Sequence, residues 1–160
     1  MRIVWAGVVL TMLLTAGCDR GSHPQRIGTV APNFTVSDRT RTIELSEYRG
    51  HTVILNLWAT WCPPCILELP SLIQLHREMP DIVIIAISQD EDADVYNRFL
   101  AQHHIDFLTV RDPTLRINQL YGTLQIPESY VIDKNGILRR KFVSAQDWTS
   151  PEIINYLKKL

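Results

Sequence analysis

Two nearly continuous apolar runs, at residues 53–57 and 82–88, restrict the fold of this chain more than any other feature. Strands buried on both faces consist of such runs, whereas half-exposed strands alternate polar and apolar residues. Between the runs, residues 63–79 have the periodicity of a helix. Its apolar residues on or near one face are Ile66, Leu69, Ile73 and Leu75. The pattern predicts a strand–helix–strand unit of a parallel sheet, with a right-handed crossover.

Two further helices are expected after this unit. The first covers about residues 92–104. Its side chains expected to face the core are Val95, Phe99 and Leu100. The second is short and starts at Asp112-Pro113, since aspartate caps a helix and proline fits its first turn, and Gly122 ends it.

The last part of the chain has the pattern of a β-hairpin followed by a helix. Residues 129–133 and 137–143 are expected strands, and Asn135-Gly136 between them is a strong hairpin signal. Thr149 or Ser150 is expected to cap the final helix. The side chains expected to face the core there are Ile153, Ile154, Leu157 and Leu160. The sequence thus predicts an α/β fold, with a mixed sheet covered by helices on both faces.

Composition and charge exclude several classes of protein. The chain has 160 residues, of which 46% are hydrophobic and 21% charged, so it is neither disordered nor collagen-like. This length is typical of one domain. Its 16 basic and 17 acidic side chains leave a net charge of −1 without a basic block, which argues against a nucleic-acid partner. Three cysteines are too few for a secreted disulfide framework.

The first seventeen residues have the pattern of a signal peptide. Arg2 is their only charge, and an apolar run follows at residues 3–14. Such a run is short for a membrane span and of the right length for the hydrophobic region of a signal. Small residues come next: Thr15, Ala16 and Gly17. Residues 1–17 are therefore excluded from the folded domain.

Residues 14–18, Leu-Thr-Ala-Gly-Cys, resemble a bacterial lipoprotein signal. The resemblance implies that Cys18 is freed by cleavage and lipidated, and that residues 18–26 tether the domain of residues 27–160 to a membrane. Asp19 hints at retention in the inner membrane. An uncleaved anchor, and an ordinary secretion signal with a free Cys18 thiol, are the alternatives. All three interpretations place the domain outside the cytoplasm, facing the periplasm or an equivalent space.

The remaining two cysteines lie in the segment Trp61-Cys62-Pro63-Pro64-Cys65, where the first strand gives way to the helix. A disulfide between them closes too short a loop to stabilise the fold by much. The pair is better suited to reversible formation and reduction of a disulfide. A helix N-terminus favours an anion, which lowers the pKa of the first cysteine and makes a nucleophilic thiolate.

At this point the chain resembles a known family. From about Gly28 to the C-terminus it is similar to thioredoxin-fold proteins of the TlpA, ResA and CcmG group, which are membrane-tethered thiol–disulfide oxidoreductases. The matching segments are residues 53–65, residues 31–34 and 45–50 in the N-terminal hairpin region, residues 126–133, and Pro70 in the active-site helix. The resemblance implies a thioredoxin fold with an N-terminal hairpin extension and a helical insert.

The resemblance also implies catalytic roles. Cys62 is the attacking thiolate and Cys65 the resolving thiol, which must lose its proton while buried. Thioredoxin has an aspartate six residues before its first cysteine, but this chain has Asn56, which cannot titrate. Glu68 lies three residues after Cys65 on the same helical face and is the expected acid or base. A solvated helix glutamate is the alternative.

Substrate binding is expected at four residues by the same resemblance. Pro127 matches the thioredoxin cis-proline, and Ile126 before it offers backbone hydrogen bonds to an extended substrate. Trp61 is expected to cover the thiols. Glu128 either shapes substrate choice or is a solvated loop acid. Trp58 and Trp148 are expected in the core.

The two prolines between the cysteines bear on the direction of electron flow. Pro63 and Pro64 carry no backbone N–H, so they remove two donors that could stabilise the Cys62 thiolate. A less stabilised reduced form makes a more reducing couple, which predicts a disulfide reductase. The resemblance implies apocytochrome c or other protein disulfides as substrates, a membrane thiol donor of the DsbD or CcdA type, and no bound cofactor. General disulfide reduction or oxidation is the alternative.

Metal binding, peroxide reduction and a non-catalytic role have less support in the sequence. Zinc needs two ligands beyond the cysteine pair, and His103-His104 have no ligand spacing, so no metal is expected. Peroxiredoxins share the fold but place threonine three residues before the reactive cysteine, where this chain has Ala59. A non-catalytic binding module is disfavoured because both cysteines and Glu68 are retained.

Overall fold

The computed structural model describes residues 27–160. The predicted signal peptide, the lipidated Cys18 and the tether lie outside the described residues. Within residues 27–160, no helix is both long and apolar enough to cross a membrane.

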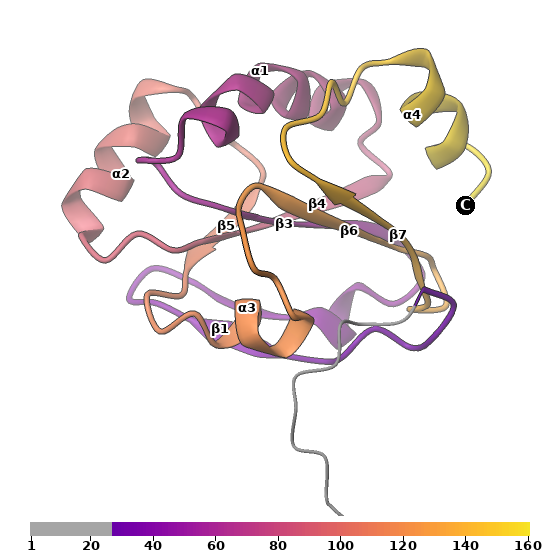
Figure 1. The fold of residues 1–160 in the computed structure, drawn as a ribbon, viewed down its shortest axis with the longest axis horizontal. Coiled ribbons are helices and arrows are strands. Elements are labelled where there is room, and N and C mark those ends of the chain that lie inside the picture. Colours follow the sequence, from indigo (N-terminus) through magenta and orange to yellow (C-terminus); the bar gives the residue numbers. More distant parts are fainter. Residues whose placement is uncertain (1–26) are drawn as a thin grey trace, which may run out of the picture.

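A five-stranded mixed sheet forms the centre of the fold, as predicted (Figure 1). Its strands, in spatial order, are β5 (Leu108–Arg111), β4 (Ile82–Ser88), β3 (Thr52–Trp58), β6 (Glu128–Ile132) and β7 (Leu138–Val143). The β3–β4 and β4–β5 pairs are parallel, and the β3–β6 and β6–β7 pairs are antiparallel. The central strand β3 is buried along its whole length, which is why its sequence is a nearly continuous apolar run.

Helices and a small hairpin cover the two faces of the sheet. One face carries α1 (Pro63–Glu78), α2 (Ala93–Gln102) and α4 (Pro151–Leu157); the other carries α3 (Arg116–Tyr121), the 3₁₀ turn η1 (Leu45–Tyr48) and the hairpin of β1 (Thr35–Ser37) and β2 (Thr42–Glu44) (Figure 1). Successive residues of β3 point to opposite faces. Ile54 therefore joins the core beneath α1, and Leu55 the core beneath the hairpin. The thioredoxin-type architecture with an N-terminal hairpin is confirmed.

The C-terminal hairpin also follows its prediction. Gly136 has φ of +76°, the left-handed conformation that glycine tolerates best, and it links β6 to β7. The Asp133 carboxylate accepts hydrogen bonds from the backbone N–H groups of Asn135 and Ile137, which stabilises the turn.

The insert between β4 and β6 differs from the sequence analysis in two places. Strand β5 was not predicted, because only four residues form it and two of them are half-buried. Val95 was expected in the core but is 41% exposed, and Tyr96 is buried in its place. The α2 helix is rotated so that the aromatic ring packs against Trp58, 6.3 Å between ring centroids.

One helix start differs from expectation. The short helix α3 begins at Arg116 rather than at Asp112-Pro113. Asp112 still contributes to the start of α3, because its Oδ2 accepts a hydrogen bond from the Ile117 N–H in the first turn. At α4 the N-cap residue is Ser150, one of the two residues predicted for it, although its side chain makes no capping hydrogen bond.

Candidate active site

The reactive pair lies at the start of α1. Cys62 is the N-cap residue, with extended backbone, and Pro63 and Pro64 fill the first two helical positions. Cys62 and Cys65 form a disulfide. The Cys65 N–H is the first backbone donor available in this turn, and it points to Cys62 Sγ at 3.3 Å. Both cysteines are nearly buried, 4% and 3% exposed.

A buried polar cluster holds the loop that leads to Cys62. The Asp90 carboxylate, just after β4, accepts hydrogen bonds from the Thr60 N–H at 3.0 Å and the Thr60 hydroxyl at 2.5 Å. The Ser88 hydroxyl donates to the same carboxylate. Because three hydrogen bonds from Thr60 and Ser88 reach one buried carboxylate, this cluster anchors the loop to the sheet.

The loop before β6 brings a backbone acceptor to the sulfur. The Ile126–Pro127 peptide bond is cis. The Ile126 carbonyl oxygen lies 3.7 Å from Cys62 Sγ, although 64 positions separate the two residues. The structure thus places Ile126, which is expected to bind substrate, beside Cys62, which is expected to attack.

Glu68 is buried in α1, with 3% of its surface exposed. The solvated alternative is therefore wrong. Its Oε1 accepts a hydrogen bond from Asn56 Nδ2 at 2.8 Å, and its Oε2 accepts from the Gln146 N–H at 3.1 Å. Burial raises the pKa of this carboxyl group, and the hydrogen bonds offset only part of that rise. A carboxyl group with a raised pKa can exchange protons closer to neutral pH, as proton transfer with a thiol requires.

The segment between β7 and α4 supplies partners of Glu68 that sequence reasoning missed. Trp148 was expected only to pack. It does pack on Phe142, 5.3 Å between ring centroids, and it is fully buried. Its indole N–H also donates to Glu68 Oε2 at 3.4 Å. The Gln146 backbone is the other partner from this segment. No local pattern in residues 144–150 signals this role, since the two partners lie 78 and 80 positions from Glu68.

Glu128, the first residue of β6, is buried as well. The Tyr130 hydroxyl donates to its Oε2 at 2.6 Å, and Lys141 Nζ lies 2.8 Å from its Oε1. The description of Glu128 as a solvated loop acid is therefore wrong. Its carboxylate faces a cation on β7 and a phenol on its own strand, next to the cis-proline.

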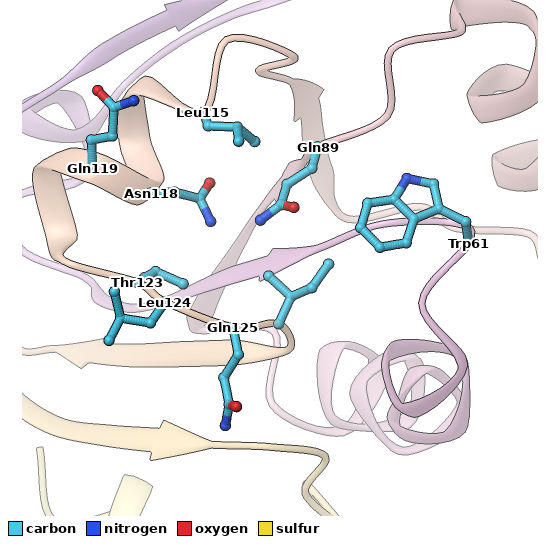
Figure 2. Close-up of a pocket in the computed structure, with 9 residues that line it drawn as sticks. Trp61, Gln89, Leu115, Asn118, Gln119, Thr123, Leu124 and Gln125 are labelled. Carbon is cyan, nitrogen blue, oxygen red and sulfur yellow. The ribbon is translucent and has the colours of Figure 1, made fainter.

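Trp61 is 62% exposed and separates two hollows in the surface. The first, about 340 Å³, lies between Trp61, the end of β4, α3 and the segment before Pro127 (Figure 2). The second, about 390 Å³, lies between Trp61 and the start of α2. A large exposed aromatic side chain beside a reactive sulfur is suited to contact a partner. Trp58, by contrast, is a core residue that packs on Phe99.

Within the described residues, no group of three or more histidine, cysteine, aspartate or glutamate side chains could hold a metal ion. The arrangement is suited to thiol–disulfide exchange, because it combines a reducible disulfide, a helix N-terminus and a buried carboxyl group.

Comparison with known proteins agrees with this chemistry. A sequence profile of the AhpC/TSA family matches residues 27–141. The chain belongs to this family. Over 99% of its length it is 35% identical to the thiol-disulfide oxidoreductase ResA of Bacillus thuringiensis, of which the match covers 96%. The ResA of Geobacillus thermodenitrificans is 32% identical over 87% of the chain and 86% of the relative.

Solved structures agree on the fold. A thiol:disulfide interchange protein DsbE from Chlorobium tepidum superposes with a TM-score of 0.73 at 29% identity, covering 84% of this chain and 94% of the other. StoA from Bacillus subtilis, at 20% identity and a TM-score of 0.66, covers 81% of this chain and 98% of its own, and it shows the fold alone. Together with the full-length relatives, these findings make this protein an enzyme of the thiol–disulfide oxidoreductase type.

Proposed function

We propose that this enzyme reduces disulfides in protein substrates, with Cys62 as the attacking thiolate, Cys65 as the resolving thiol and Glu68 as the acid and base for Cys65. The observation that carries the proposal is the buried carboxyl group of Glu68 in the same helix as the cysteine pair. Three residues of separation place Glu68 and Cys65 on one face of α1.

The reaction balances without a bound cofactor. The Cys62 thiolate attacks one sulfur of the substrate disulfide, so a Cys62–substrate disulfide forms and the first substrate thiolate leaves. Glu68 accepts the proton of Cys65. The Cys65 thiolate then attacks Cys62 Sγ, the Cys62–Cys65 disulfide forms, and the second substrate thiolate leaves. Two electrons pass from the protein to the substrate, and an external dithiol must return them.

The direction of electron flow follows from the missing donors at the start of α1. With proline at the first two helical positions, the only early backbone N–H near Cys62 Sγ is that of Cys65. Fewer donors leave the thiolate less stabilised, which favours oxidation of the pair and reduction of the substrate.

The proposed location is the outer face of the cytoplasmic membrane, with the domain tethered through a lipid on Cys18. The proposal rests on the sequence of residues 1–18. There the dithiol donor would be a membrane protein of the DsbD or CcdA type. Apocytochrome c, whose haem-attachment motif has the pattern Cys-x-x-Cys-His, is the substrate that the resemblance to the ResA and CcmG group favours.

The first experiment is a redox titration of residues 19–160 in a dithiol buffer. A reduction potential near that of thioredoxin, about −270 mV, supports a reductase. A potential near that of DsbA, about −120 mV, would make the protein an oxidase. In the same preparation, a Cys65→Ser variant should accumulate a mixed disulfide with an oxidised Cys-x-x-Cys-His peptide, seen by mass spectrometry, and a Cys62→Ser variant should not.

Peroxide reduction is the alternative within the same fold. The residue three positions before Cys62 is Ala59, which is buried and has no hydroxyl to bind a peroxide. We expect the reduced protein to consume hydrogen peroxide no faster than a free dithiol does. Consumption a hundredfold faster would overturn the reductase assignment.

A further inference from the structure

The hollow between Trp61 and α3 adjoins the reactive sulfur. Trp61 precedes Cys62 in the chain, and Ile126, whose carbonyl oxygen lies 3.7 Å from Cys62 Sγ, forms another wall. A polypeptide whose cysteine is bonded to Cys62 can therefore reach this hollow. Its volume of about 340 Å³ equals that of roughly ten water molecules, enough for a side chain.

The wall of this hollow is neutral and rich in carboxamides. Four carboxamide side chains line it, those of Gln89, Asn118, Gln119 and Gln125, and none of its lining residues carries a charge. Figure 2 shows the side chains of Asn118 and Gln89 turned toward one another across the space. The second hollow, on the other side of Trp61, differs in being lined by Asp90, Glu91 and Asp92.

Asn118 is a buried polar side chain of the first hollow, and one of its polar atoms lacks a hydrogen-bond partner among the described residues. It is 6% exposed, and its Oδ1 has no hydrogen-bond partner in the described part of the chain. A buried amide oxygen without a partner is destabilising, and a bound ligand with a matching donor would recover that loss. Because a carboxamide can turn over about its last bond, it can offer either its oxygen or its N–H groups.

We propose that this hollow is a substrate subsite for an uncharged hydrogen-bonding side chain, such as that of Gln, Asn, Ser or Thr, near the substrate cysteine, and that Asn118 determines its specificity. A charged side chain would lose its hydration against a wall without a counter-charge. An apolar one would leave the Asn118 carboxamide unpaired. The inference rests on the proposed function, since it assumes that a peptide disulfide reaches Cys62.

The test measures the reduction of short peptides whose single cysteine is bonded to a small thiol. Each of the four positions within two residues of that cysteine is set in turn to Gln, Leu or Lys. At one or more positions we expect Gln to raise kcat/KM about tenfold over Leu and Lys, the effect of roughly one hydrogen bond to a buried group. The symmetrical disulfide of 2-mercaptoethanol serves as a substrate that cannot fill the subsite.

Two variants assign the preference to Asn118. Asn118→Leu should bring the Gln and Leu peptides within twofold of each other, and Asn118→Asp should shift the preference to Lys. Asn155→Leu, at an exposed position of α4, should leave the preference unchanged. Reduction of the small disulfide should be the same in all four proteins, which separates a change of specificity from a loss of folding.

The possible results separate a failure of the subsite proposal from a failure of the proposed reductase function. If the wild type reduces neither the peptides nor the small disulfide, the proposed function fails. If it reduces them without preferring Gln, or if the preference survives both Asn118 variants, the subsite assignment is wrong and the reductase proposal stands.

Discussion

The Asn56 side chain donates a hydrogen bond from Nδ2 to Glu68 Oε1, 2.8 Å away. Asn56 lies on β3 at the position where thioredoxin has an aspartate. In this protein the residue at that position is a neutral carboxamide, and it donates a hydrogen bond to the carboxyl group of Glu68 on α1. Asn56 Nδ2 also lies 2.9 Å from the hydroxyl of Ser129 on β6, so β3, α1 and β6 meet at this group. The titratable group of the site therefore comes from the helix that carries the cysteines.

A Glu68→Gln variant should resolve the mixed disulfide about a hundredfold more slowly at neutral pH, which is the lower end of the effect of a general base. In the wild type the rate should rise as Glu68 ionises, above its raised pKa. The variant should lack that rise and follow the thiol titration alone. Stopped-flow tryptophan fluorescence with an oxidised peptide, from pH 5 to 9, measures both profiles. Equal profiles would remove Glu68 from the mechanism.

The same substitution should change how stability depends on pH. Since the folded protein raises the pKa of Glu68 above its value in the unfolded chain, the folded state holds the proton more tightly. The stabilisation from this group is complete below the unfolded pKa and is lost as pH rises through the folded pKa. Glutamine does not titrate, so Glu68→Gln should gain stability relative to wild type as pH rises.

Urea unfolding of the oxidised proteins at pH 4 and pH 8 checks this. The oxidised form is used because disulfide-bonded cysteines do not titrate. Glu152→Gln is the matched control, since Glu152 pairs with Arg140 on the surface and its loss should change stability by less than about 1 kcal/mol at either pH. A difference between Glu68→Gln and wild type that stays constant with pH would contradict the prediction.

Restoring a backbone donor at the start of α1 should make the couple less reducing. Pro64 holds the second helical position, where an N–H can reach the N-cap side chain. In Pro64→Ala, a new hydrogen bond to the Cys62 thiolate of about 1.5–3 kcal/mol would raise the potential by about 30–60 mV. Pro63→Ala is the control, because the first helical N–H does not reach that side chain. Redox titration should show the larger shift for Pro64→Ala.

The ion pair between Lys141 and Glu128 should contribute to stability because its acidic member is buried. The Glu128 side chain is 3% exposed and that of Lys141 28%. Lys141→Met would leave a buried carboxylate without its cation, so we expect the free energy of unfolding to fall by about 1–3 kcal/mol. The loss is smaller than for a fully buried pair, because the lysine is partly exposed. A Lys141→Met/Glu128→Gln double variant should recover more than half of it in denaturant unfolding. Additive losses would show that the two side chains act separately.

Local patterns were enough to predict most of the architecture. The apolar runs that became β3 and β4, the helix after Cys62 and the turn at Gly136 each depend on neighbours within about ten residues. The position of Cys62 and Cys65 at a strand-to-helix junction follows from the same patterns, so the sequence alone identifies the reactive pair. The one missed strand, β5, is too short for periodicity to reveal.

What surrounds the reactive pair depended on the tertiary structure. The partners of Glu68 come from positions 56, 146 and 148, and the cation of Glu128 comes from the neighbouring strand. The orientation of α2, which buries Tyr96 and exposes Val95, depends on packing against Trp58. The carboxyl groups could be named from the chain, but whether they are ionised or protonated depends on burial and on donors brought together only by folding, because desolvation and hydrogen bonds act across space rather than along the sequence.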